Sequence, residues 1–222
     1  MKKFIPIVFM LLAPALCGLA RSLAAEIAPG ALETSGASSS LPSCVHSERD
    51  LASIRHVQKA NPKTFHKYDG YRQTLRASSN LELAARLVYA ETLAANCPGR
   101  EDRLADLIAA VIGNRIRIRG DAESVIFQRD QFASSLNIYS ESRYRDFLCP
   151  RDSGLWIKSL GAMRANLESS KPNAPILVDT VNYYLFRHSD RFKAPAWKLR
   201  EATIADSEIR ECIRVYRVPG WR

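Results

Sequence analysis

Residues 104–116 read LADLIAAVIGNRI, and their apolar side chains recur at the three- and four-residue spacing of one helix face. Glu101 or Asp102 is expected to begin this helix, and Gly120-Asp121 to turn the chain after it. An apolar face this broad is typical of a helix that packs in the centre of a domain. It consists of Leu104, Leu107, Ile108, Val111, Ile112 and Ile116. The stretch therefore predicts a domain organised around one central helix.

Patterns on either side predict further helices and two strands. The expected helices run from Ser79 or Asn80 to about residues 96–99, over 124–127, and over 153–167. Residues 181–186 (VNYYLF) and 212–218 (CIRVYRV) are rich in aromatic and β-branched side chains, so they could pair as a small sheet. The predicted fold class is therefore α+β, mainly α, with a small β-sheet beside the helices.

The first residues have the pattern of a secretory signal peptide. Residues 1–24 combine a basic start, an apolar run and small residues before an expected cleavage near Ala24. Pro6 and Pro14 interrupt an apolar run that is short for a membrane-spanning helix. The mature protein is therefore predicted to be periplasmic or secreted, with only a transient membrane contact through the signal peptide.

Three segments are predicted after the signal peptide. Residues 25–47 are rich in Ala, Gly, Ser and Pro, which is typical of a flexible linker. Residues 48–78 carry many charges and a short amphipathic pattern, and they predict an N-terminal helical extension. Residues 79–222 form the main domain, which is long enough for one sizeable core.

The chain is basic, and this bears on its partners. Removal of residues 1–24 takes away Lys2, Lys3 and Arg21 and no acidic residue, so the net charge falls from +9 to +6. A basic exported protein is attracted to anionic polymers of the cell envelope such as peptidoglycan. Nucleic acid is the competing polyanion, but the predicted location and the lack of a binding motif argue against it.

The cysteines predict disulfides and not a metal site. The mature chain keeps Cys44, Cys97, Cys149 and Cys212, and an even count in an oxidising compartment indicates two disulfides. Four cysteines allow three pairings, between which the sequence does not choose. There is no Cys-x-x-Cys motif, and His46, His56 and His66 have no partner histidine four residues away. We therefore predict no metal and no cofactor.

One acid interrupts an apolar helix face. Leu83, Leu87 and Glu91 are spaced four apart, so Glu91 occupies a position where an apolar residue is expected. Partial withdrawal from water would disfavour the charged carboxylate and raise its pKa toward the range of a general acid. The alternative is that Glu91 lies at the edge of this face and reaches solvent.

Several motifs in this order resemble the catalytic core of the bacterial cell-wall hydrolase family that includes the spore-cortex-lytic enzymes. The motifs are residues 87–91 (LVYAE), 107–116 (LIAAVIGNRI), 124–128 (SVIFQ), 131–133 (QFA), 182–184 (NYY) and 195–197 (PAW). The resemblance covers roughly residues 81–198. It implies a lysozyme-like or transglycosylase-like helical fold.

The resemblance also implies a reaction. Glu91 would donate a proton to the MurNAc-GlcNAc glycosidic bond of peptidoglycan, and no second acid is fixed by a motif. Other acids, namely Asp102, Asp106, Asp121 and Asp130, have simpler explanations as caps, exposed residues or turn formers. A lone glutamate fits a lytic transglycosylase, in which the same residue acts as acid and then as base. Muramidase-type hydrolysis is the alternative.

The matching motifs imply a set of substrate-binding side chains. These are Gln131, Phe132, Asn182, Tyr183, Tyr184 and Trp197, with Ser134 in the polar loop that follows. Polar groups would bind sugar hydroxyl and N-acetyl groups, and aromatic faces would pack on sugar rings. Phe132 and one of the tyrosines could instead belong to the core. Asn114 and Arg115 are expected to support Glu91 or the neighbouring loop.

The chain departs from the family beside the proposed acid. Residues 92–97 (TLAANC) replace a glycine-containing acidic stretch, and Cys97 could lock this altered loop through a disulfide to Cys149. The main rival to an enzyme is a non-catalytic peptidoglycan-binding protein. A third hypothesis is a muralytic partner of an envelope-spanning secretion or flagellar assembly. The protein is expected to be a monomer.

Overall fold

The computed structural model describes residues 40–45, 75, 78–127, 132, 141–169, 183–186 and 200–217. They belong to one compact unit that begins at Ser38. The predicted signal peptide lies outside the described residues, as does the predicted N-terminal extension apart from residues 75 and 78. Within the described ranges, no helix combines the length and the apolar content that crossing a bilayer requires.

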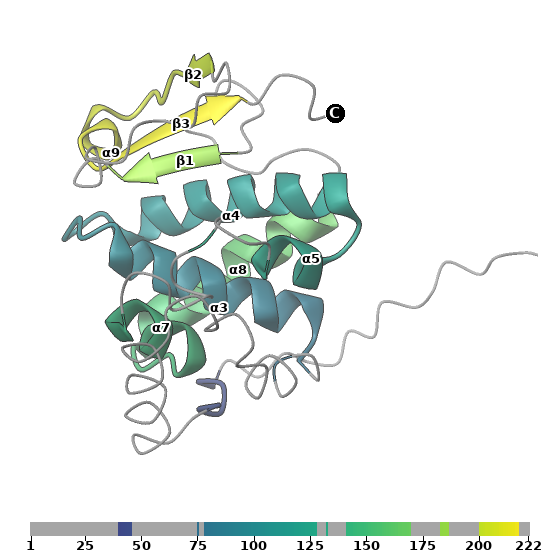
Figure 1. Cartoon of the computed structure of the whole chain (residues 1–222). Helices are drawn as coiled ribbons and strands as arrows, with labels where there is room; N and C mark the ends of the chain where they lie inside the picture. The colour runs from purple at the N-terminus through teal and green to yellow at the C-terminus, as the bar shows by residue number, and fades with distance from the viewer. Residues whose placement is uncertain are drawn as a thin grey trace, which may run out of the picture. The chain divides into compact units, whose positions relative to one another are not determined.

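Three long helices form the body of the domain, and each contacts the other two. They are α3 (Asn80–Ala94), α4 (Glu101–Arg119) and α8 (Ser153–Glu168). Two shorter helices pack on them: α5 (Ala122–Ile126) contacts α3 and α4, and α7 (Glu141–Leu148) contacts α3. Figure 1 shows this layer of helices with the small sheet lying over α4.

The central role predicted for α4 is confirmed. All six residues of its predicted apolar face are buried, and α4 contacts α3, α8, α5 and the first strand of the sheet. Gly113 lets α4 approach α8 closely, because a Cβ atom there would lie 3.1 Å from Asn166 Cβ. The mainly helical fold class therefore follows from the burial of one continuous apolar face.

Local capping determines where the helices begin and end. The Ser79 hydroxyl accepts a hydrogen bond from Glu82 N at 3.1 Å and begins α3. Asp152 does the same for α8 by accepting from Leu155 N at 2.9 Å. Gly120 ends α4 with φ 92°, a left-handed conformation that favours glycine. These helix ends lie within one or two residues of the predicted ones.

The sheet has three antiparallel strands in the order β1-β3-β2. They are β1 (Tyr183–Phe186), β2 (Arg200–Ala202) and β3 (Ile213–Arg217). The predicted strands 181–186 and 212–218 correspond to β1 and β3, which pair with Tyr184 opposite Val215. Three short elements were not predicted from the sequence: β2, α7 and the four-residue helix α9 (Ser207–Arg210). Elements this short, or with this few apolar residues, show little periodicity.

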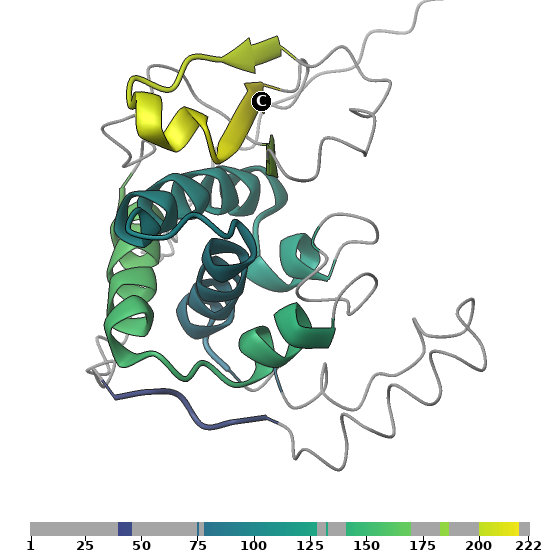
Figure 2. The ribbon, with the colours of Figure 1, turned by 90° about the vertical axis from the view of Figure 1, so that its left-hand side faces the viewer.

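The end of the predicted flexible linker packs on the domain. Cys44 forms a disulfide with Cys149, and Val45 N donates a hydrogen bond to Leu148 O at 3.0 Å. The buried Arg86 side chain donates to Ser43 O at 2.8 Å and to Leu148 O at 2.9 Å. Residues 40–45 therefore form a docked strap, which Figure 2 shows beside α7 and the start of α8, away from the sheet.

Candidate functional site around Glu91

Glu91 lies in the last turns of α3 and is buried, with 4% of its surface exposed. Leu87, which precedes it on the same helix face, is fully buried. The alternative that Glu91 reaches solvent at the edge of this face is therefore wrong. The mismatch in the apolar pattern correctly indicated a buried acid.

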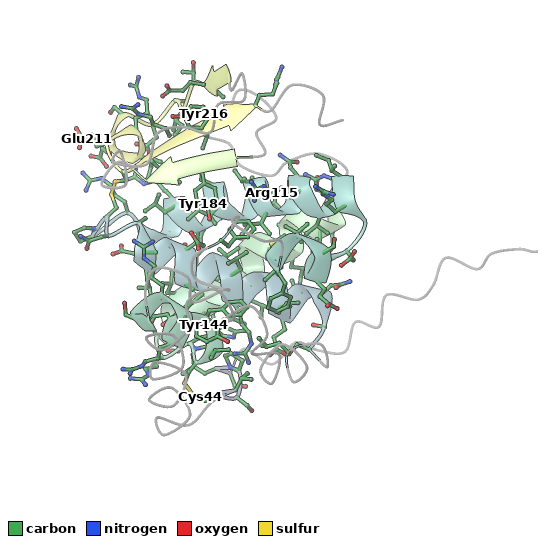
Figure 3. The ribbon with its side chains drawn as sticks, in the orientation of Figure 1. Cys44, Arg115, Tyr144, Tyr184, Glu211 and Tyr216 are labelled. Carbon is green, nitrogen blue, oxygen red and sulfur yellow. A yellow bond between two sulfur atoms is a disulfide. The ribbon has the colours of Figure 1, made fainter. Side chains whose placement is uncertain are left out.

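The sheet supplies a hydrogen-bond donor to this acid. The Tyr184 hydroxyl of β1 donates to Glu91 Oε2 at 2.9 Å. Tyr184 pairs with Val215, a fully buried residue of β3, so both side chains lie on the sheet face that packs on the helices. Figure 3 shows Tyr184 extending from β1 toward the helices. Two residues from distant parts of the sequence therefore meet at the carboxyl group.

Phe132 and Arg115 extend the cluster behind Tyr184. The ring centroids of Phe132 and Tyr184 are 6.4 Å apart, and the Arg115 guanidinium carbon lies 4.9 Å from the Phe132 centroid. Phe132 and Arg115 are both buried, which places Phe132 in the core. A guanidinium on an aromatic face contributes roughly 0.5 to 2 kcal/mol. A series of contacts therefore runs from Arg115 through Phe132 to Tyr184, whose hydroxyl reaches Glu91.

Asn114, the neighbour of Arg115, belongs to a second polar group. The Arg117 guanidinium donates hydrogen bonds to Asn114 Oδ1 and, at 2.7 Å, to the main-chain oxygen of Asn166. Partial burial lowers the pKa of Arg117. These contacts join the last turns of α4 and α8. The structure thus brings Arg115 to the Glu91 cluster and Asn114 to the α4–α8 crossing.

Thr92 follows Glu91 and was not identified as a site residue from the sequence. Its side chain is 1% exposed, and its Oγ1 atom has no hydrogen-bond partner among the described residues. A buried hydroxyl without a partner costs roughly 1 to 3 kcal/mol. Its only sequence signal was its place in the stretch that departs from the family pattern.

Glu91 is the only buried Asp or Glu among the side chains that the structure describes, and Asp146 of α7 is half-buried, with the pKa of its carboxyl group raised by desolvation. Asp102 is exposed, and Asp106 forms an ion pair with Lys158 at 2.9 Å. Asp121 begins α5 by accepting a hydrogen bond from Ser124 N at 2.6 Å. Asp130 lies outside the described residues. The same ranges contain no group of three His, Cys, Asp or Glu side chains that could hold a metal ion.

The two predicted disulfides are present, and the pairing suggested for Cys97 is wrong. Cys97 pairs with Cys212, and Cys149 pairs with Cys44. Cys97 lies in the turn between α3 and α4, whereas Cys212 lies immediately before β3. The disulfide therefore joins the segment after Glu91 to the sheet. Cys149 instead lies at the end of α7, beside the docked strap.

Several predicted binding residues stay predictions. Gln131, Ser134, Asn182 and Trp197 lie outside the described residues. Tyr183 is described only through its backbone, which pairs with Tyr216. Of the predicted substrate-binding side chains, the structure therefore places Phe132 and Tyr184 at the Glu91 cluster.

Comparison of this chain with models of known protein families, with curated proteins and with solved structures finds no match. The likeness to the spore-cortex-lytic family therefore rests on the motifs in the sequence.

Proposed function

We propose that this protein is an exported enzyme that cleaves the MurNAc-GlcNAc bond of peptidoglycan as a lytic transglycosylase, with Glu91 as general acid and base. The observation that carries the proposal is that Glu91 is buried while the other described acids are not. It is the only buried acid of the described residues, and it lies at the motif position of the acid, in contact with Tyr184. Burial and specific partners perturb the pKa of a carboxyl group, and groups perturbed in this way cluster at functional sites.

In the proposed reaction, protonated Glu91 donates its proton to the glycosidic oxygen as the bond to the muramic acid C1 atom breaks. The resulting oxocarbenium-like centre is attacked by the C6 hydroxyl oxygen of the same sugar. The Glu91 carboxylate then removes the proton of that hydroxyl, which regenerates the acid. The product carries a 1,6-anhydro ring, so no water is consumed and no second carboxylate is required, in contrast to ordinary glycoside hydrolysis.

Tyr184 suits this cycle because it stabilises the charged carboxylate form of Glu91, which exists between the two proton transfers. A hydrogen bond from its hydroxyl to Oε2 favours the charged form of Glu91 and restricts rotation of the carboxyl group. Phe132 and Arg115 in turn hold the tyrosine ring. Positioning of this kind is worth more in catalysis than the hydrogen bond contributes to stability alone.

The burial of Glu91 also favours a second candidate function. A side chain that is 4% exposed and bonded to β1 could serve to anchor the sheet on the helices. The protein would then be a non-catalytic peptidoglycan-binding protein with the same fold. In that case Glu91 would matter for stability and not for turnover.

The test is mass spectrometry of soluble fragments released from purified peptidoglycan by the mature protein and by Glu91→Gln. The glutamine can still accept the Tyr184 hydrogen bond but cannot cycle a proton. Glu168→Gln is the matched control, because it makes the same chemical change at an exposed position of α8. Fragments with 1,6-anhydro ends from the wild type and the control, and none from Glu91→Gln, are the expected result.

Two outcomes would contradict this proposal. Reducing muramic acid ends would show hydrolysis and require a second carboxylate. Binding of all three proteins to peptidoglycan without fragment release would favour the non-catalytic role. A co-sedimentation assay with the same peptidoglycan separates loss of binding from loss of turnover.

A further inference from the structure

The Cys97–Cys212 disulfide joins the segment that follows Glu91 to the segment that precedes β3, the strand paired with the one that carries Tyr184. Cys97 follows Glu91 by six positions, and Cys212 directly precedes β3. In β3, Val215 pairs with Tyr184 of β1. The disulfide therefore closes a short covalent path from the helix that carries the acid to the sheet that carries its hydrogen-bond donor. Its two Cα atoms are 5.9 Å apart.

Ion pairs reinforce the same junction. Arg103 of α4 contacts Asp206 Oδ2 at 2.5 Å and Glu208 Oε2 at 2.7 Å, and Arg100 Nε lies 3.4 Å from the same Glu208 oxygen. Figure 1 shows α9, which includes Glu208, close to the beginning of α4. The Arg103 and Glu208 side chains are 45% and 52% exposed. Ion pairs with such exposed members contribute little to stability and are screened by salt.

Apolar contacts also hold the sheet on the helices. They do not fix its position as narrowly as a hydrogen bond requires. Ile209, Ile213 and Val215 are fully buried and belong to the core cluster. Burial of apolar surface is not directional, so small sliding movements change it little. The hydrogen bond from Tyr184 to Glu91, in contrast, weakens over a few tenths of an ångström.

We propose that Cys97 and Cys212 are positioning residues, whose disulfide holds the sheet so that Tyr184 contacts Glu91. The inference rests on the proposed function of Glu91 for its catalytic consequence. Reduction by a dithiol transfers two electrons and two protons to the two sulfur atoms, and the dithiol becomes a disulfide. The sheet of the reduced protein is then held by apolar contacts and by ion pairs that salt weakens.

The second disulfide provides a matched control. Cys44–Cys149 spans 105 residues and Cys97–Cys212 spans 115. In the chain-entropy account, loops of such similar length stabilise the folded state almost equally. Cys44–Cys149 joins the docked strap to the end of α7 and includes no part of the sheet. Figure 3 shows Cys44 on the side of the helices opposite the sheet.

The experiment compares the full mature chain with two double variants, Cys97→Ser/Cys212→Ser and Cys44→Ser/Cys149→Ser. The first readout is hydrogen exchange of the β1 and β3 amides, together with the ¹³C shift of the Glu91 carboxyl group. We expect at least tenfold faster exchange and a changed Glu91 shift in the first variant only. Neither readout requires activity, so they test the positioning role even if the proposed function fails.

The second readout is kinetic and separates positioning from stability. We expect kcat for fragment release to fall about tenfold in Cys97→Ser/Cys212→Ser with little change in KM. Tyr184→Phe should lower kcat in the wild type and in the Cys44/Cys149 variant, but cause no further loss in the Cys97/Cys212 variant. Such non-additivity is expected if the disulfide acts through Tyr184.

Equal exchange, equal Glu91 shifts and additive effects of Tyr184→Phe in both variants would overturn the positioning role. If the Cys97/Cys212 variant does not fold, the Cys44→Ser/Cys149→Ser variant is reduced with dithiothreitol instead, so that only the Cys97–Cys212 disulfide responds. The same exchange and shift measurements then decide the outcome.

Discussion

The helical layer and the sheet are held in place by different kinds of interaction. In α3, α4 and α8, buried apolar residues pack against one another where the three helices meet. The sheet adds a smaller set of buried side chains and depends also on one disulfide, exposed ion pairs and the bond from Tyr184 to Glu91. We infer that the helices supply most of the stability, whereas the sheet determines the geometry around the acid.

A substitution in the central helix should have the largest effect. Leu107→Ala removes a fully buried side chain of α4, and such changes cost roughly 2 to 5 kcal/mol. We expect the free energy of unfolding, measured by urea denaturation, to fall by about 3 kcal/mol. Leu93→Ala, at an exposed leucine of α3, is the control and should cost less than about 0.5 kcal/mol. Similar losses in both variants would contradict a core centred on α4.

A substitution in the sheet should affect the site more than the fold. Tyr184→Phe removes the donor to Glu91 Oε2, and the loss of a hydrogen-bond partner by a buried polar atom costs roughly 1 to 3 kcal/mol. We expect a loss of about 2 kcal/mol in the free energy of unfolding. The alkaline limb of the pH–rate profile should also move to higher pH, because the carboxylate form of Glu91 loses a stabilising contact.

Tyr216→Phe is the matched control for this change. Tyr216 pairs with Tyr183, so its side chain lies on the opposite face of the sheet from Tyr184. The control should leave the pH–rate profile unchanged. A shift of equal size in both variants would show that the effect comes from the sheet as a whole and not from contact with Glu91.

The helical layer was largely predictable from the sequence, and the reason is local. The apolar face of α4, the Ser79 cap and the left-handed Gly120 are signals that depend on residues three or four positions apart. The strands β1 and β3 were found from their aromatic and β-branched residues. The four residues of α9 and the three of β2 are too few to show a period.

The site was predictable in its acid but not in its contacts. The pattern mismatch at Glu91 correctly indicated burial. Its partner Tyr184 is 93 positions away, and a contact over that distance depends on how the sheet packs on the helices. The disulfide pairing has the same origin, since Cys97 and Cys212 meet only once the sheet is in place. Local pattern therefore identified the groups, whereas tertiary packing determined which of them touch.

Thr92→Val tests whether the buried hydroxyl next to Glu91 lowers the free energy of unfolding. Valine has nearly the same shape as threonine and removes the buried hydroxyl that lacks a partner among the described residues. We expect the free energy of unfolding to rise by about 1 kcal/mol, the lower end of the cost of an unsatisfied buried group. Ser159→Ala, which removes another buried hydroxyl without a described partner, is the control on α8. A rise in stability with a loss of fragment release for Thr92→Val alone would assign the hydroxyl to the site.

The smallest expected effect is a pH-dependent one in the helical layer. The hydrogen bond that Asp121 accepts from the backbone N–H of Ser124 lowers the pKa of this carboxyl group. Because its pKa is lower in the folded state, the ionised group stabilises the protein at pH values above its ordinary pKa of about 3.9. This contribution is lost as the pH falls through the lowered folded-state value.

Asp121→Asn keeps an acceptor at the start of α5 and removes the charge. We expect it to lower the free energy of unfolding by about 0.5 kcal/mol at pH 7, within the range for a charge at a helix N-terminus. The difference from wild type should shrink below about pH 4 and vanish once Asp121 is protonated in both states. Ser79→Ala removes a cap of the same geometry that does not titrate, so its cost of about 1 kcal/mol should be the same at both pH values. If the loss of stability in Asp121→Asn instead grows as the pH falls, the sign of this electrostatic contribution is reversed. The charge of Asp121 would then be unfavourable in the folded state.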